Sequence, residues 1–442
     1  MQIRLSDHFT YRRLLRFTLS PIVMMIFTSI YSMIDGFFVS NFVGITPFAA
    51  VNLIYPVPTI LGAVGFMIGS GGSALVSKTL GEGRNGDANR VFSLLVWAGL
   101  AVGIILSALG FAFLRPIALL LGADDAMLPY CLIYGRFLLA ALPCFLLQMM
   151  FQNFLVTAER PRLGLAVTVS AGLTNVALDA LFVAGFRWGL VGAALATTLA
   201  QAVGGLVPLV YFLRPNGSLL RLGRPARSLG ALLRACGNGS SELVANVSMS
   251  LVSILYNFQL MRLTGENGVA AYGAVMYVGF LFVAVFFGYS TGVSPVIGFH
   301  FGARDHDELR GLFRKSLVVI LSAGAILAAL AFALADPLAR LYVGARPELR
   351  AMTANAFRAF AVSVLFIGFN VFGSAFFTAL NNGAVSGVIS FLRTFLFQVA
   401  AVLLLPIPFG LDGVWYSLFA GEAVSSVVVI VFLVVNRRRY RY

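Results

Sequence analysis

The sequence predicts an all-α integral membrane protein with twelve transmembrane helices, in two six-helix lobes related by a pseudo-two-fold axis along the membrane normal. Three observations predict this fold class. The composition is strongly apolar, apolar runs of membrane-spanning length recur along the chain, and the second half of the 442 residues repeats the first. We expect an N-lobe over 1–213, a linker over 214–237 and a C-lobe over 238–442.

The composition indicates that this chain resides in a lipid bilayer. Hydrophobic residues make up 60% of the sequence and charged residues 11%, and the mean hydropathy is +0.92. Soluble globular proteins average about 25% charged residues. The 3 cysteines are too few and too scattered for a disulfide framework or a metal site. We therefore exclude a soluble protein and expect no metal and no organic cofactor.

Twelve apolar runs are each long enough to cross about 30 Å of hydrocarbon as a helix, at about 1.5 Å per residue. Helices are expected rather than a β-barrel, because the runs show no alternation of apolar and polar residues and the backbone must be hydrogen-bonded in lipid. The expected spans are 17–41, 48–77, 91–112, 128–156, 163–184, 189–213, 238–263, 268–298, 314–335, 350–378, 384–407 and 411–435.

An offset of 221 residues, half the chain, brings matching positions of the two halves into register. Gly81 falls on Gly302, and Gln201 falls on Glu422. Six spans per half insert both halves in the same sense, so the axis relating them is expected to run along the membrane normal. A duplicated membrane domain of this size is typical of a transporter whose site lies between the repeats.

The distribution of Lys and Arg predicts the orientation. With the N-terminus inside, the inner segments hold 22 of the 31 Lys and Arg residues and the outer loops hold six. This asymmetry predicts cytoplasmic termini in a bacterial or archaeal inner membrane. The net charge of +14 could suggest a nucleic-acid partner. The basic residues instead lie beside the span ends, where they meet anionic lipid, so we expect membrane lipid and no nucleic acid as a partner.

Several motifs carry a family resemblance. They are Ser20-Pro21, the run from Tyr31 to Val39, the glycine-rich stretch from Gly65 to Gly72, and Thr174 to Asp179 followed by Trp188 to Ala194. Together they resemble the multidrug and toxic compound extrusion (MATE) transporters, and within them the MepA-like branch. The resemblance implies two lobes around a central cavity. It also implies export of small organic, often cationic compounds, driven by inward movement of H⁺ or Na⁺.

Two acidic residues of the first half predict a cation-coupling site. Asp35 and Asp179 lie about six and five residues from the outer ends of their spans, which puts both about 8–9 Å below one surface. Asn175 precedes Asp179 by one helical turn, and Thr197 lies at a similar depth. Carboxylates buried together favour binding of a proton. In archaeal and NorM-like MATE proteins the matching positions belong to the amino-lobe cation site; the alternative is a purely structural hydrogen-bonding role.

The second half places its intramembrane charges differently. Arg393 and Glu422 lie near one depth, which predicts an ion pair with a structural role. Glu242 lies near the start of the seventh span, either as a favourable first-turn carboxylate or as a contact for cationic substrate. With Gln148 and Gln201, these residues complete the candidate set of substrate-facing polar side chains.

Other functions are less well supported by the residues. Span 350–378 carries no Asp or Glu, unlike the NorM-like pattern, so no second sodium site is expected there. No nucleophile with a base lies on any span, so no catalytic residue and no enzyme is expected. A channel is disfavoured because no repeated filter loop is visible. The alternative is a metabolite exporter or a lipid-linked saccharide flippase, although Arg393 is the only basic residue near mid-membrane. We expect a monomer.

Overall fold

The computed structural model describes residues 3–344 and 347–442, without the side chains of residues 32, 33, 35–37, 39–41 and 45. The described chain is helical and contains no strand. The first half comprises α1 (Tyr11–Phe42), α2 (Ile45–Ile54), α3 (Pro56–Gly81), α4 (Asn85–Leu120), α5 (Leu128–Thr157), α6 (Pro161–Asp179), the π-helical η1 (Ala180–Gly185) and α7 (Gly189–Leu213). The second half comprises α8 (Leu229–Thr264), α9 (Glu266–Gly302), α10 (His306–Ala333), α11 (Ala335–Val343), α12 (Pro347–Ala379), α13 (Gly383–Phe391), the π-helical η2 (Leu392–Leu396), α14 (Phe397–Leu404) and α15 (Pro406–Tyr440).

Twelve helical spans of the described chain are long and apolar enough to cross a membrane, which confirms the predicted number. The helix after the predicted linker begins earlier than expected, at Leu229, because the side chain of Ser228 accepts a hydrogen bond from the Ala231 amide and caps it. Residues 229–237 of the expected linker are therefore helical. The expected span 48–77 comprises α2 and α3, and α3 starts at Pro56, a residue favoured in the first turn of a helix.

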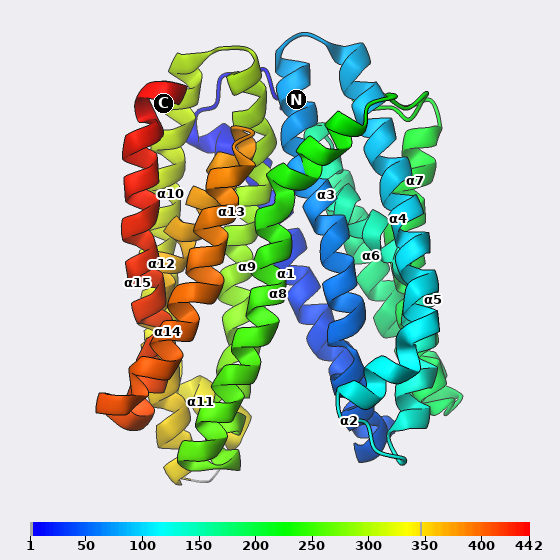
Figure 1. Ribbon diagram of the computed structural model, residues 1–442, viewed down its shortest axis with the longest axis vertical. Coiled ribbons are helices and arrows are strands. Elements are labelled where there is room, and N and C mark those ends of the chain that lie inside the picture. The colour runs from blue at the N-terminus through cyan, green and yellow to red at the C-terminus, as the bar shows by residue number, and fades with distance from the viewer. Residues whose placement is uncertain (1–2, 345–346) are drawn as a thin grey trace.

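Helix packing follows the sequence repeat. In the N-lobe, α5 contacts α3, α4 and α7; in the C-lobe, α12 contacts α9, α10 and α15 in the equivalent arrangement. Between the lobes, α3 packs on α8 and α9 packs on α1, which are again equivalent pairs. Figure 1 shows the lobes converging at the end of the bundle where both termini lie and separating toward the other end. We call the first of these the closed end.

Glycines at repeat-related positions allow the lobes to touch at the closed end. A Cβ on Gly81 of α3 would lie 2.0 Å from the carbonyl oxygen of Phe299, and a Cβ on Gly302 of α9 would lie 2.1 Å from that of Lys78. Glycine is required because any side chain would collide with the backbone of the opposite helix. The same 221-residue offset relates Gly81 to Gly302 and Lys78 to Phe299, so this crossing lies on the pseudo-two-fold axis.

The segment before α1 joins the lobes at the same end. The Leu5 amide donates to Glu159 Oε1 of the N-lobe at 2.6 Å, and the Phe9 amide donates to Glu308 Oε1 of the C-lobe at 2.8 Å. His8 Nδ1 lies 2.6 Å from Glu308 Oε2. Leu5 and Phe9 are fully buried, so this segment is part of the closed end rather than a free tail.

Candidate functional site

The N-lobe brings three of the four predicted coupling residues together on α6 and α7. Asp179 at the end of α6 is 0% exposed and Asn175, one turn earlier, is 2% exposed. Asn175 Nδ2 donates to Thr197 Oγ1 of α7 at 3.4 Å. The side chain of Asp35 lies outside the described residues; its position belongs to α1.

Local sequence places this group where helices α1 and α6 approach closely. A Cβ on Gly172 would lie 2.5 Å from Phe27 and 3.0 Å from Tyr31, both on α1, one turn before Asn175. Immediately after Asp179 the chain widens into the π-helical segment η1. Such wide turns inside helices recur at functional sites, because they re-aim side chains that a regular helix would hold in register.

The helices that bear the predicted coupling residues carry no Lys, Arg or His at membrane depth, and Arg136 of the neighbouring α5 is exposed. The stretches 17–42 of α1, 163–186 of α6 and η1, and 189–213 of α7 contain no Lys, Arg or His. Taking a carboxylate into such surroundings is costly for its charged form, so binding of a proton or a small cation is favoured there. The arrangement is therefore chemically suited to cation exchange.

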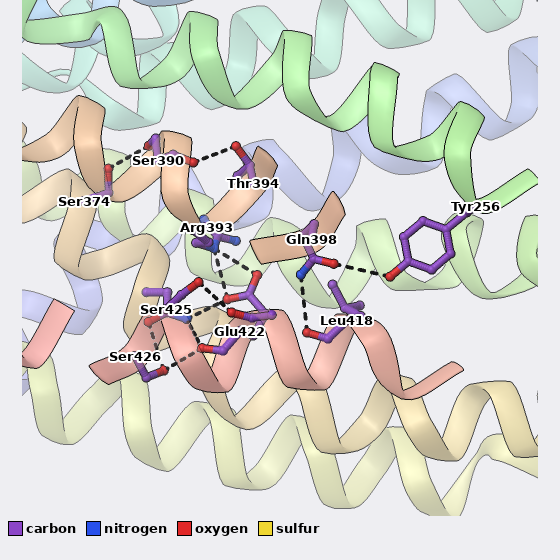
Figure 2. A network of polar contacts seen from close by, with 12 residues as sticks. Tyr256, Ser374, Ser390, Arg393, Thr394, Gln398, Leu418, Glu422, Ser425 and Ser426 are labelled. Carbon is purple, nitrogen blue, oxygen red and sulfur yellow. Dashed lines mark hydrogen bonds and ion pairs between the residues drawn. The ribbon is translucent and has the colours of Figure 1, made fainter. Parts of the chain in front are cut away.

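The C-lobe contains a different arrangement around Glu422 of α15, drawn in Figure 2. Arg393 Nε donates to both carboxylate oxygens, at 2.9 and 3.0 Å, so the predicted ion pair forms. Asn370 of α12 donates a further hydrogen bond to Glu422 Oε2 at 2.7 Å, and Ser426 donates to Asn370 Oδ1 at 3.0 Å. Both charged side chains are mostly buried, and each carboxylate oxygen accepts at least one hydrogen bond.

Arg393 lies in the second π-helical segment, η2. It lines a small cavity of about 30 Å³ together with Glu242 of α8 and Asn153 of α5, so this cavity lies between the lobes. It is large enough for a water molecule. The alternative of a first-turn carboxylate is wrong for Glu242, because α8 starts at Leu229 and its first turn contains no acidic residue. Within the described chain, the Glu242 carboxylate makes no hydrogen bond and no ion pair, which leaves it able to meet a ligand.

The remaining two predicted residues lie apart from this C-lobe group. Gln148 of α5 and Gln201 of α7 both belong to the N-lobe. Gln148 is buried against α7, where a Cβ on Gly204 would lie 2.6 Å from its Cδ. Among the residues that the structure describes, neither side-chain oxygen has a hydrogen-bond donor. Helices α5 and α7 of the N-lobe correspond to α12 and α15 of the C-lobe. The N-lobe pair thus carries two neutral amides, Gln148 and Gln201, whereas α15 carries the charged Glu422.

Sequence reasoning missed the amide that holds Glu422. Asn370 lies on the span 350–378, and the absence of Asp and Glu from that span was the available signal. A neighbouring contact was also missed: the hydroxyls of Tyr256 and Ser417 lie 2.7 Å apart, and the Tyr256 hydroxyl donates to Gln398 at 3.3 Å. The described residues contain no group of three or more His, Cys, Asp or Glu that could hold a metal ion.

Solved structures share the whole architecture. A MATE transporter of the MOP superfamily in an outward-facing conformation superposes with a TM-score of 0.91, at 21% identity, covering 98% of this chain and 97% of that one. A MOP superfamily transporter from Pyrococcus furiosus, whose reverse polarity of the binding pocket is taken to suggest a different function, superposes with a TM-score of 0.88 at 21% identity, with coverage of 98% and 97%. These likenesses establish the fold.

Sequence comparison agrees with the fold. The multidrug export protein MepA of Staphylococcus haemolyticus is 22% identical over 429 residues, covering 97% of this chain and 94% of that protein. MepA of Staphylococcus aureus is 22% identical over 436 residues with the same coverage. The family model described as MatE matches twice, over residues 21–181 and 243–403, stretches that begin 222 residues apart and so follow the repeat. The chain therefore belongs to the MatE family of membrane transporters.

Proposed function

We propose that this protein is a multidrug efflux antiporter that exports small organic, often cationic compounds in exchange for H⁺ or Na⁺. The observation that carries the proposal is the complete burial of Asp179, one turn after Asn175 on a helix without a basic residue at membrane depth. Asn175 in turn donates a hydrogen bond to Thr197 of α7. The names of the similar MepA proteins as multidrug export proteins support the substrate class.

The coupling follows from what a bound cation does to a buried carboxylate. Binding of H⁺ or Na⁺ neutralises the site and removes the cost of a charge in apolar surroundings, so the packing of α1 against α6 and α7 can change. A ligand drives such a switch only through different affinities for the two states, so the cation and the organic compound must favour opposite states. No cofactor takes part, and a monomer is sufficient.

The proposal includes an orientation. The closed end carries both termini, and the excess of Lys and Arg on the corresponding segments supports a cytoplasmic position for it, in the inner membrane of a bacterial or archaeal cell. The lobes then separate toward the outside. An organic compound released from this state leaves the cell, and protonation from the outside favours the return to the inward-facing state.

Transport in proteoliposomes tests the proposal. A fluorescent cationic dye is loaded, a pH gradient and then a sodium gradient are imposed, and the protein is compared with its Asp35→Asn and Asp179→Asn variants. We expect dye movement under one of the gradients and its loss in both variants. Asp125→Asn, the same chemical change on an exposed loop residue, serves as the control and should transport normally.

Two outcomes would contradict parts of the proposal. Full gradient-driven transport by both intramembrane variants would remove the N-lobe site from the coupling mechanism. Absence of dye movement under either gradient, with folded protein in the vesicles, would favour a lipid or metabolite substrate within the same architecture.

A further inference from the structure

A large cavity at the closed end lies outside the transport pathway proposed above. It has a volume of about 820 Å³ and is formed by the end of α3, the start of α4, the linker between the lobes and the start of α8. Six of its lining residues are cationic: Lys78, Arg84, Arg90, Arg224, Arg227 and Arg234. We call it the arginine cavity. It joins residues of both lobes, because Lys78 belongs to α3 and Arg234 to α8.

The positive charge of the arginine cavity is not balanced from within. Its two acidic residues, Glu82 and Asp87, both pair with Arg84. Within the described part of the chain, no carboxylate lies within ion-pair distance of the other five cations. Unpaired cations that share one concave surface repel each other and attract an anion, most strongly one that carries several oxygens.

The linker that carries Arg224 and Arg227 is fixed in place rather than loose. Three of its backbone amides donate hydrogen bonds to α4: Arg221 to Asn89 Oδ1 at 2.6 Å, Gly223 to Ser93 Oγ at 3.0 Å and Ala226 to Arg90 O at 2.9 Å. The Ser228 cap then starts α8 directly after it. The two guanidinium groups are therefore held on a preorganised backbone, which lowers the entropy lost on binding an anion.

Apolar surface continues from the arginine cavity along α8. Leu229 and Leu233, one turn apart on α8, are 70% and 61% exposed. A second cavity of about 850 Å³ shares Lys78 and Arg234 with the first and extends to Val388 and Phe391 of α13, both exposed. Exposed apolar side chains on a membrane helix beside a basic cluster fit a lipid, whose headgroup meets the cations while its acyl chains follow the helix.

We propose that the arginine cavity binds a phosphate-bearing anion, supplied by the headgroup of an anionic phospholipid whose acyl chains lie along α8 and α13. Bound there, the phosphate links α3 and α4 of the N-lobe to the linker and to α8 of the C-lobe. The lipid thereby stabilises the closed end. A free phosphate compound from the cytoplasm shares the headgroup chemistry, and the experiment separates the two sources.

Binding to delipidated protein in detergent tests the site. Phosphatidylglycerol, phosphatidylcholine and soluble inorganic pyrophosphate are the probes, with native mass spectrometry reporting bound lipid and thermal unfolding reporting stabilisation. The Arg224→Gln/Arg227→Gln variant removes two exposed cavity arginines. The Arg437→Gln/Arg438→Gln variant removes two exposed arginines near the chain end that do not line the cavity, and it is the matched control.

We expect phosphatidylglycerol, but not phosphatidylcholine, to remain bound and to raise the unfolding temperature of the wild type and of the control variant. In the cavity variant its apparent affinity should fall about tenfold or more. Pyrophosphate giving the same cavity-dependent shift, with no lipid retained, would support the anion site and assign it to a soluble ligand. Equal losses in cavity and control variants, or no effect of any probe, would overturn the proposal.

A single substitution, Arg227→Gln, keeps the test decisive if the double variant does not fold. Arg227 is exposed, so its replacement should leave the unliganded protein stable while weakening the phosphatidylglycerol effect in the same direction. Dye transport does not enter these measurements, so failure of the proposed function and failure of this site are distinguishable.

Discussion

In the C-lobe the buried carboxylate of Glu422 has a guanidinium at 2.9 Å, whereas in the N-lobe the buried Asp179 lies on helices that carry no basic residue at membrane depth. The two lobes repeat one helical framework, but the two carboxylates occupy different positions in it, because the 221-residue offset pairs Glu422 with Gln201. The difference therefore lies both in the position of each carboxylate and in its neighbouring side chains. Asn370 and Arg393 donate hydrogen bonds to Glu422. Asn175 lies one turn before Asp179 and donates to Thr197 of α7.

The different surroundings of Glu422 and Asp179 suggest different roles for the two lobes in transport. A carboxylate fixed by a guanidinium and an amide has its charge already compensated, so it gains little from a proton. A buried carboxylate on helices that carry no Lys, Arg or His at membrane depth gains more from a proton or a small cation. We infer that the N-lobe responds to the coupling ion, while the C-lobe pair holds its helices in a fixed arrangement against which the N-lobe can move.

The largest effect is expected from Asp179→Asn on transport. The amide has nearly the shape of the carboxylate but binds no proton, so gradient-driven dye transport should fall to background. The variant should still fold and insert into the membrane, because the amide keeps the volume of the carboxylate. Transport and denaturant unfolding measured on the same preparation check this. Retained coupling in the variant would remove the functional contrast between the lobes.

The next effect concerns the stability of the C-lobe. Arg393→Met leaves Glu422 buried without its cation and should lower the free energy of unfolding by about 3–5 kcal/mol. The double variant Arg393→Met/Glu422→Gln removes both charges and should recover most of this loss. Denaturant unfolding of the two variants makes the comparison. If both lose equal stability, the ion pair is not what holds α13, η2 and α15 together.

A smaller effect tests the equivalence of the lobes at their crossing. Gly81→Ala and Gly302→Ala each force a methyl group against the opposite backbone and should each cost about 1–3 kcal/mol. Gly273→Ala on α9 is the control, because no atom lies within 4 Å of its Cβ position and the change should be neutral or stabilising. Clearly unequal losses at the two crossing positions would show that the interface is asymmetric.

The smallest effect concerns the anchors of the N-terminal segment. Burial raises the pKa of the Glu159 carboxyl above its usual value of 4.5, against the lowering effect of the hydrogen bond from the Leu5 amide. The folded protein therefore holds this proton more tightly than the unfolded chain. The resulting stabilisation is complete below pH 4.5 and is lost as the pH rises through the raised pKa.

Glu159→Gln should flatten this part of the pH dependence, measured as the unfolding temperature across the acidic range. Asp125→Asn, which alters an exposed carboxyl, should leave the dependence unchanged. An identical slope in wild type and the Glu159 variant would show that the N-lobe anchor does not titrate in this range.

Much of the architecture could be predicted because hydrocarbon imposes simple constraints. A span must be long, apolar and internally hydrogen-bonded, so twelve helices can be read from composition and length alone. The depth of Asn175 and Thr197 followed from counting residues from the span ends, and the structure places them 3.4 Å apart. The spacing of one turn to Asp179 is likewise a property of the helix itself.

Other features depend on contacts between distant segments. The amide that holds Glu422 comes from α12, 52 residues away in sequence, and no periodicity indicates that Asn370 faces it. The start of α8 at Leu229 depends on a capping side chain within a stretch rich in arginine and glycine, which composition alone identifies as a linker. The arginine cavity depends on the linker lying against α4, a contact that charge counting cannot reveal.

The sequence by itself determined the membrane setting, the number of spans, the duplication and the identity of the buried charges, because each is set by local chemistry or by repetition along the chain. Only the tertiary structure decided which buried charge is compensated and which cations share one cavity. Those outcomes depend on distances between helices, and such distances are fixed by packing, as where Gly81 and Gly302 let α3 and α9 touch.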